Sequence, residues 1–187
     1  MAAYHPYPDD PFSLLPDDSL RSAPYEHVRG QPALIVDGQQ RPLPSDPAEY
    51  GRQFSAYLDR ARSESTFIEL TVTGHIDTVG QRCSLAVCAV KLDEEPTPEG
   101  LRLYCLVTED SLVDFLGSQW NRVVRKFLPD IGGSALALGK RFDTLRASYA
   151  CPQGPWVASK LGAVVLVQDV ASRKVYQAAQ LRRFNLD

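Results

Sequence analysis

The chain has 187 residues, of which 44% are hydrophobic, so it can bury a substantial core but holds at most two small domains. Its 20 Lys and Arg against 23 Asp and Glu give a net charge of −3. This charge provides no general attraction for nucleic acid or an anionic membrane. No apolar run approaches the roughly 20 residues of a membrane span. We therefore expect a globular protein with neither a nucleic-acid partner nor a membrane span.

The first 47 residues hold nine of the fourteen prolines, which predicts an extended arm with little regular structure. Residues 1–10 have no basic n-region and no apolar h-region, so we expect no secretory signal in this chain. Within the arm, Gly30-Gln31-Pro32 precedes the apolar residues 33–36 and the dipeptide Asp37-Gly38. This order predicts a loop, a strand and a tight turn.

A helix is expected over residues 46–62. Asp46 is suited to the N-cap, Pro47 to the first helical position, and Glu49 follows three residues after the cap. The apolar residues recur at helical spacing and predict one packed stripe: Tyr50, Phe54, Tyr57, Leu58 and Ala61.

After residue 63 the hydrophobic pattern changes from helical to alternating, which predicts a boundary between an N-terminal segment, residues 1–63, and a β-domain, residues 64–187. Short connections separate the predicted strands, at residues 67–76, 85–92, 101–107, 140–149, 161–169 and 175–181. Six or seven strands of this length are typical of a β-sandwich of immunoglobulin-like size. The predicted fold class is therefore mainly β (α+β), with a sandwich and one N-terminal helix.

One segment of the β-domain has helical rather than alternating spacing. Its apolar residues are Trp120, Val123, Val124, Phe127 and Leu128, and they would share one stripe of a short helix lying across a sheet edge. The basic residues Arg122, Arg125 and Lys126 fall outside that stripe. An alternative function for this segment is a basic docking surface for an acidic partner, with Arg122 and Arg125 as binding residues.

The four cysteines are too few and too irregularly spaced for a disulfide scaffold or a zinc ribbon. Cys83 and Cys88 are five residues apart, so on one regular strand they would point to opposite faces. If a disulfide forms, Cys88 and Cys105 are the expected pair, and otherwise both are small buried thiols. Cys151, a lone cysteine past a predicted strand, is expected to be structural.

Neither catalytic residues nor a cofactor site are predicted. The chain contains no Cys-x-x-Cys, so it lacks the dithiol that thiol-disulfide exchange needs. The three histidines, His5, His27 and His75, lie in unrelated contexts without supporting ligand spacing, so no metal site is expected. A hydrolase or a metal enzyme stays open as a further hypothesis, although the sequence offers no motif for either.

Several short motifs occur in one order along the chain and together resemble a known family. They are Tyr4-His5, Asp10-Pro11-Phe12, Arg21 with Tyr25, Val28-x-Gly30-x-Pro32, Asp37-Gly38, Thr108-Glu109-Asp110, Asn121-x-Val123-x-Arg125, Val165-x-Val167-Gln168-Asp169 and Val175-x-Gln177-Ala178. The family is the group of outer-membrane-protein-related bacterial thioredoxin-like proteins with a C-terminal β-sandwich. Family members usually carry histidines where this chain has Trp120 and Arg122, so no acid/base or metal role is transferred to that segment.

The resemblance implies that residues 1–63 are the later part of a thioredoxin-like domain, in which Pro32 matches the cis-proline that faces the redox dithiol. Two functions follow from it. The first is a non-catalytic binding or assembly module, with Gly30, Gln31 and Pro32 facing an extended peptide by β-augmentation and with a protein partner or a second copy in a homodimer. The alternative is the C-terminal portion of a thiol-disulfide oxidoreductase whose catalytic cysteines lie outside this chain. An extracytoplasmic location is implied if the chain is part of a longer precursor.

Overall fold

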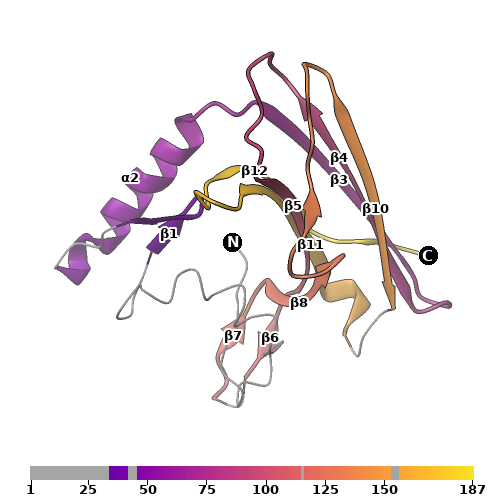
Figure 1. Cartoon of the computed structure of the whole chain (residues 1–187). Coiled ribbons are helices and arrows are strands. Elements are labelled where there is room, and N and C mark those ends of the chain that lie inside the picture. The colour runs from indigo at the N-terminus through magenta and orange to yellow at the C-terminus, as the bar shows by residue number, and fades with distance from the viewer. Residues whose placement is uncertain (1–33, 42–45, 115, 153–155) are drawn as a thin grey trace.

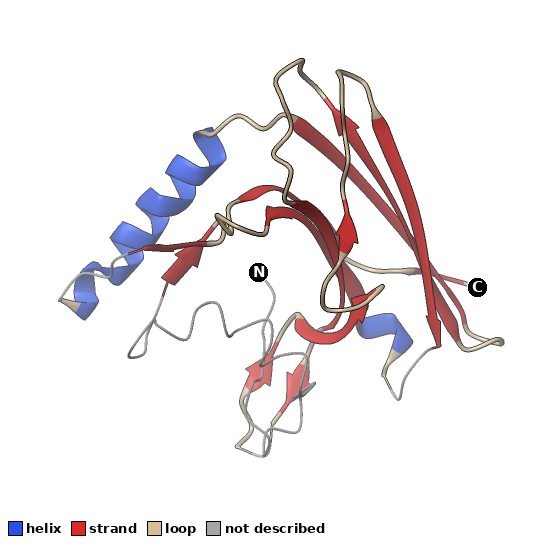
Figure 2. Cartoon of the chain, in the orientation of Figure 1, coloured by secondary structure: helices blue, strands red, loops and turns tan. Residues whose placement is uncertain are grey.

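The fold is mainly β, with one α-helix among the described residues, as the sequence predicts (Figure 2). The computed structural model describes residues 34–41, 46–114, 116–152 and 156–187. The larger strands are β3 (Ile68–Asp77), β4 (Arg82–Lys91), β5 (Leu101–Glu109), β8 (Val123–Leu128), β10 (Thr144–Pro152), β11 (Leu161–Asp169) and β12 (Val175–Leu181). The short strands are β1 (Leu34–Val36), β2 (Gln39–Arg41), β6 (Leu112–Val113), β7 (Gln119–Trp120), β9 (Ser134–Ala135) and β13 (Asn185–Leu186). The helical elements are η2 (Pro47–Glu49), α2 (Tyr50–Ser63) and η3 (Ala158–Lys160).

Two sheets form the sandwich. The four-stranded sheet has the order β10-β4-β3-β13, and the five-stranded sheet has the order β12-β11-β5-β8 with β9 also paired to β5. All of these pairs are antiparallel except β13 with β3. The main core lies between the sheets because inward-facing residues of both are buried, among them Leu85, Val87, Leu103 and Val165. In Figure 1, α2 lies on the left and β3, β4 and β10 on the right, with β12 between them.

The five-stranded sheet buries apolar residues on both faces. Along β5, Leu103, Cys105 and Val107 belong to the main core, whereas Tyr104 and Leu106 belong to a second cluster. The second cluster also includes Val124, Phe127 and Val164. A continuous apolar run such as β5 is typical of a strand covered on both faces.

Most predicted strands are confirmed. Residues 161–169 and 175–181 are β11 and β12 with the predicted bounds, and the ends of β3, β4 and β5 differ from their predictions by at most three residues. The strand predicted from residue 140 begins instead at Thr144. Its first residues form a turn in which the Asp143 carboxylate accepts the backbone N–H groups of Gly139 and Lys140, at 2.7 and 2.9 Å.

The helix expected over residues 120–128 is wrong, because this segment contains β7 and β8. Val124 pairs with Thr108 and Lys126 with Val107, so Arg125 is the extra residue of a β-bulge. The bulge brings Val124 and Phe127, three residues apart, into one apolar cluster on the same face. Residues three apart on a regular strand would face opposite ways. Bulged strands and helices can thus give the same apolar spacing.

The predicted N-terminal helix is confirmed, and it starts with the short 3-10 turn η2. The Asp46 side chain caps this turn by accepting the backbone N–H of Ala48 at 2.9 Å. Glu49 forms an ion pair with Arg52 rather than completing a capping box. None of the residues of α2 is buried. Its apolar stripe is therefore only half covered.

The predicted turn at Asp37-Gly38 is confirmed as the bend between β1 and β2, and both residues have positive φ angles, 50° and 73°. This hairpin packs on the turn between β11 and β12. Gln39 Nε2 donates to the Ser172 carbonyl at 2.8 Å, and the Val175 N–H donates to the Asp37 carbonyl at 2.9 Å. A Cβ atom at Gly38 would lie 1.7 Å from the Arg173 carbonyl oxygen. Only glycine satisfies both the backbone angle and this close approach.

The cysteine predictions have two outcomes. Cys83 is buried and Cys88 is half-exposed on β4, so the prediction that they point to opposite faces is confirmed. The predicted Cys88–Cys105 pair is wrong, because Cys88 lies on the outer face of the four-stranded sheet and Cys105 on the inner face of the other sheet. Cys151 lies within β10 rather than after a strand.

The division of the chain into an N-terminal segment, residues 1–63, and a β-domain, residues 64–187, stays a prediction.

Candidate functional site

A groove with a volume of about 430 Å³ lies where α2, β1 and β12 meet. The segments that line it are far apart in the sequence: Val36 and Asp37, then Leu58, Ala61 and Arg62, then residues 64–66, then residues 174–178. In Figure 1, β1 lies between α2 and the strand labelled β12. No sequence pattern predicts the groove, because tertiary packing alone brings the end of α2 beside β12.

The helical side of the groove offers apolar surface. Leu58 and Ala61 belong to the stripe of α2, and both are only half-buried. Tyr57 in the same stripe lies under the Arg41 guanidinium, with 6.0 Å between the guanidinium carbon and the ring centroid. Apolar side chains that keep contact with water gain free energy when a further surface covers them. This side of the groove is therefore suited to an apolar ligand group.

The strand side of the groove is an edge of the sandwich. β12 is the last strand of the five-stranded sheet and pairs with β11 on one side only. At its first residue, the Val175 N–H already donates to a carbonyl of the β1–β2 hairpin. Beyond that residue, none of the described strands continues the sheet. The Ala178 N–H donates to the side-chain oxygen of its neighbour Gln177, at 3.0 Å. An edge strand without a neighbouring strand is a template for an added one.

Charged groups line one end of the groove. Lys174 pairs with Glu64 at 3.2 Å, and its Nζ lies 5.3 Å from the centroid of the Tyr176 ring. Burial raises the pKa of Asp37 above 3.8, and the Glu64 carboxylate raises it further, while Arg41 and Lys174 partly oppose both effects. A carboxyl group with a raised pKa in a groove is one mark of a functional site. A cation placed near Asp37 would be stabilised there.

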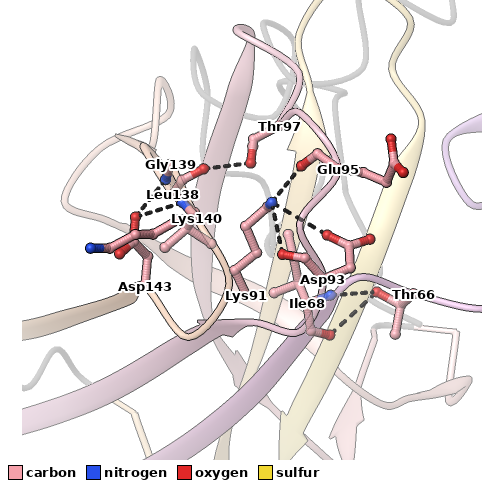
Figure 3. Close-up of polar contacts among 10 residues, drawn as sticks. All are labelled: Thr66, Ile68, Lys91, Asp93, Glu95, Thr97, Leu138, Gly139, Lys140 and Asp143. Atoms are coloured by element: carbon pink, nitrogen blue, oxygen red, sulfur yellow. Dashed lines mark hydrogen bonds and ion pairs between the residues drawn. The ribbon is translucent and has the colours of Figure 1, made fainter.

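A second polar cluster surrounds Lys91 at the end of β4 (Figure 3). The side chain is completely buried, and its Nζ donates to the carbonyls of Asp93, at 3.0 Å, and Glu95. The Asp93 carboxylate forms an ion pair with the same ammonium at 3.3 Å. These contacts hold the loop after β4 against the sandwich. The ammonium therefore serves the fold rather than a ligand.

The two basic residues predicted to bind an acidic partner have different surroundings. Arg125 is mostly buried, with its Nε 3.4 Å from Oε2 of the buried Glu109, whose Oε1 accepts the Val157 N–H at 2.9 Å. Arg122 is half-exposed and has a positive φ of 56°, and its N–H donates to the Asp110 carboxylate at 2.8 Å. Arg125 is thus engaged within the sandwich, and a docking role for the pair stays a prediction.

The other predicted binding residues, Gly30, Gln31 and Pro32, lie outside the described residues. Within the described ranges, no group of three or more His, Cys, Asp or Glu side chains is arranged to hold a metal ion. None of the described helices combines the length and the apolarity that crossing a membrane requires.

Two solved structures from Porphyromonas gingivalis have folds similar to this chain. HBP35 matches with a TM-score of 0.70 and 12% identity, over 88% of this chain and 56% of that chain. A domain of the outer membrane lipoprotein Omp28 matches with a TM-score of 0.50 and 19% identity, over 66% of this chain and 93% of that domain. The chain shares its fold with these bacterial proteins. No protein-family model matches it, and no curated protein matches it by sequence.

Proposed function

We propose that the chain is a non-catalytic protein-binding module that receives an extended segment of a partner in the groove between α2 and β12. The observation that carries this proposal is the coincidence of an edge strand, β12, with a helix whose apolar stripe is only half covered. A strand edge supplies main-chain hydrogen bonds, and side-chain pockets beside it supply selectivity.

The lining residues indicate which segment fits. Leu58, Ala61 and Val175 favour apolar side chains. Asp37, whose carboxyl has a raised pKa, favours a Lys or Arg side chain because a cation beside it would stabilise the charged form. The preferred segment is therefore extended, with apolar residues at alternate positions and a basic residue that reaches Asp37.

The similarity to a domain of an outer membrane lipoprotein supports an extracytoplasmic site of action for this chain. Similarity at this level of identity shows the fold alone, so the binding function depends on the groove. The absence of a Cys-x-x-Cys in the sequence supports a module without thiol-disulfide catalysis of its own.

Selection from a library of random peptides displayed on phage tests the proposal, with the purified full chain as bait. The groove variant is Ala178→Arg, which adds a long charged side chain at an exposed lining position of β12. Ala61→Arg blocks the helical side of the groove. Ala56→Arg is the matched control, because Ala56 is exposed on α2 and does not line the groove.

We expect selected peptides to contain a basic residue between apolar ones and to bind the wild type and Ala56→Arg equally. Binding to either groove variant should weaken at least about tenfold, equivalent to ~1.4 kcal/mol. If no peptide is enriched, or if both groove variants bind like the control, the groove is not the binding site. Light scattering tests for a second copy as occupant: a wild-type dimer that Ala178→Arg converts to a monomer would make the groove a self-association surface and contradict a foreign partner.

A further inference from the structure

Two cysteines far apart in the sequence are paired by the register of the four-stranded sheet. β4 and β10 are antiparallel, and Cys83 of β4 lies directly opposite Cys151 of β10. Directly opposite residues of an antiparallel pair have Cα atoms about 4.5–5.5 Å apart. A disulfide requires a Cα separation of roughly 4.4–6.8 Å. The backbone of the folded chain therefore already has the spacing of a disulfide at this position.

The other two cysteines are not placed to compete. Cys88 of β4 lies opposite Arg146 of β10 and Thr71 of β3, on the outer face of the sheet. Cys105 belongs to the other sheet, and burial raises the pKa of its thiol to about 12, which suppresses the reactive thiolate. The register singles out one pair among the four cysteines.

We propose that Cys83 and Cys151 form a cross-strand disulfide when the chain is in an oxidising compartment. The bond would tie β10, the edge strand of its sheet, covalently to β4. Two thiols lose two protons and two electrons, and a disulfide acceptor such as oxidised glutathione is reduced to two thiols in exchange. The inference is independent of the proposed binding function, since the groove is lined by neither β4 nor β10.

The location of Cys83 fits a structural disulfide rather than a catalytic one. Cys83 has 2% of its surface exposed and belongs to the main core. A disulfide with a buried sulfur at Cys83 would be protected from attack by small thiols at that sulfur in the folded state. Extracytoplasmic proteins are the class in which such bonds form and persist. The fold shared with an outer membrane lipoprotein domain is consistent with that compartment.

Mass spectrometry of the full chain tests the proposal. The purified protein is refolded with reduced and oxidised glutathione, quenched in acid, denatured and alkylated, and its proteolytic peptides are mapped. We expect a peptide pair linked through Cys83 and Cys151, with Cys88 and Cys105 alkylated. Alkylation of all four cysteines, or a link through Cys88 or Cys105, would overturn the proposal.

Thermal unfolding gives a second test. Reductant should lower the Tm of the wild-type chain by roughly 5–15 °C, the effect expected for the loss of one disulfide. Cys88→Ser should keep this response, whereas Cys151→Ser and Cys83→Ser should lose it. If either of the last two variants fails to fold, the comparison of the wild type with and without reductant still decides, and an unchanged Tm counts against the bond.

Discussion

The sandwich and the segment that contains α2 bury their apolar side chains to different extents. In the sandwich, residues such as Leu103 and Val165 are fully buried between two sheets. In α2, the apolar residues also recur at a spacing that predicts one packed face, yet none of them is buried. The interior of the sandwich is thus fully packed, whereas α2 and the neighbouring edge strand β12 keep surface that a partner can cover. This contrast locates the proposed function at their junction.

The largest expected effect on the free energy of unfolding comes from truncating a side chain in the core of the sandwich. Leu103→Ala should lower the free energy of unfolding by about 2–5 kcal/mol, because it leaves a cavity at a fully buried position. The equivalent change on α2, Leu58→Ala, should cost less than about 1 kcal/mol, since this side chain is half-exposed. Denaturant unfolding of both variants measures the difference. Equal losses would remove the contrast between the two regions.

A smaller loss is expected from the charged pair inside the sandwich. Arg125→Ala leaves the Glu109 carboxylate buried without its counter-charge and should cost about 3 kcal/mol. Arg122→Asn is the control, because Asn tolerates the positive φ there and the Arg122 side chain is half-exposed. This control should change stability by less than about 0.5 kcal/mol. If Arg125→Ala were as mild as the control, Arg125 would be available for docking.

A still smaller and local effect is expected at the contact that attaches the β1–β2 hairpin. Gly38→Ala introduces a Cβ atom into the space of the Arg173 carbonyl, so the hairpin should detach and the Val175 amide should exchange roughly tenfold faster. Gly117→Ala has a similar positive φ of 80° but open space around it. Hydrogen exchange measured by NMR separates the two effects. Faster exchange at Val175 in the Gly117 variant would show that the close approach at Gly38 is not the cause.

The smallest expected effect is a pH dependence of opposite sign at two carboxyl groups. The pKa of Asp37 is raised above 3.8 in the folded protein, chiefly by burial, so ionisation of Asp37 destabilises the fold as the pH rises past 3.8. Asp37→Asn should therefore be more stable than the wild type at neutral pH and lose this advantage below pH 3.8. Thermal unfolding across this pH range measures it.

Asp143 supplies the contrasting case. Hydrogen bonds from the backbone N–H groups of Lys140 and Gly139 hold the pKa of Asp143 below 3.8. Its ionised form contributes stability above pH 3.8, and this contribution is lost as the pH falls through the lowered pKa. Asp143→Asn should thus be less stable than the wild type at neutral pH. A shift of the same sign for both variants would contradict the assigned environments.

The sequence predicts elements best where one pattern decides them. Residues 161–169 form a continuous apolar run between turn residues, and both ends of β11 follow from it. The apolar spacing of β8 instead predicts a helix, because the extra residue of its bulge, Arg125, imitates helical spacing. Bulges depend on the partner strand, and no local pattern in β8 alone reveals one.

The candidate site was less predictable than the fold. Its lining comes from the end of α2 and from β12, segments separated by more than half of the chain, and neither carries a motif for binding. What the sequence does contain is the stripe of α2, which predicts a packing face but not how far that face is covered. The Asp37-Gly38 turn was predicted, although its docking on the β11–β12 turn depends on tertiary contacts.

The central claim is that a partner completes the groove between α2 and β12, and hydrogen–deuterium exchange with and without a selected peptide tests it most directly. The account predicts added protection in residues 50–66 and 174–181, with little change in β4 and β10. Protection confined to residues 119–126, around Arg122 and Arg125, would contradict it and place binding at the other surface.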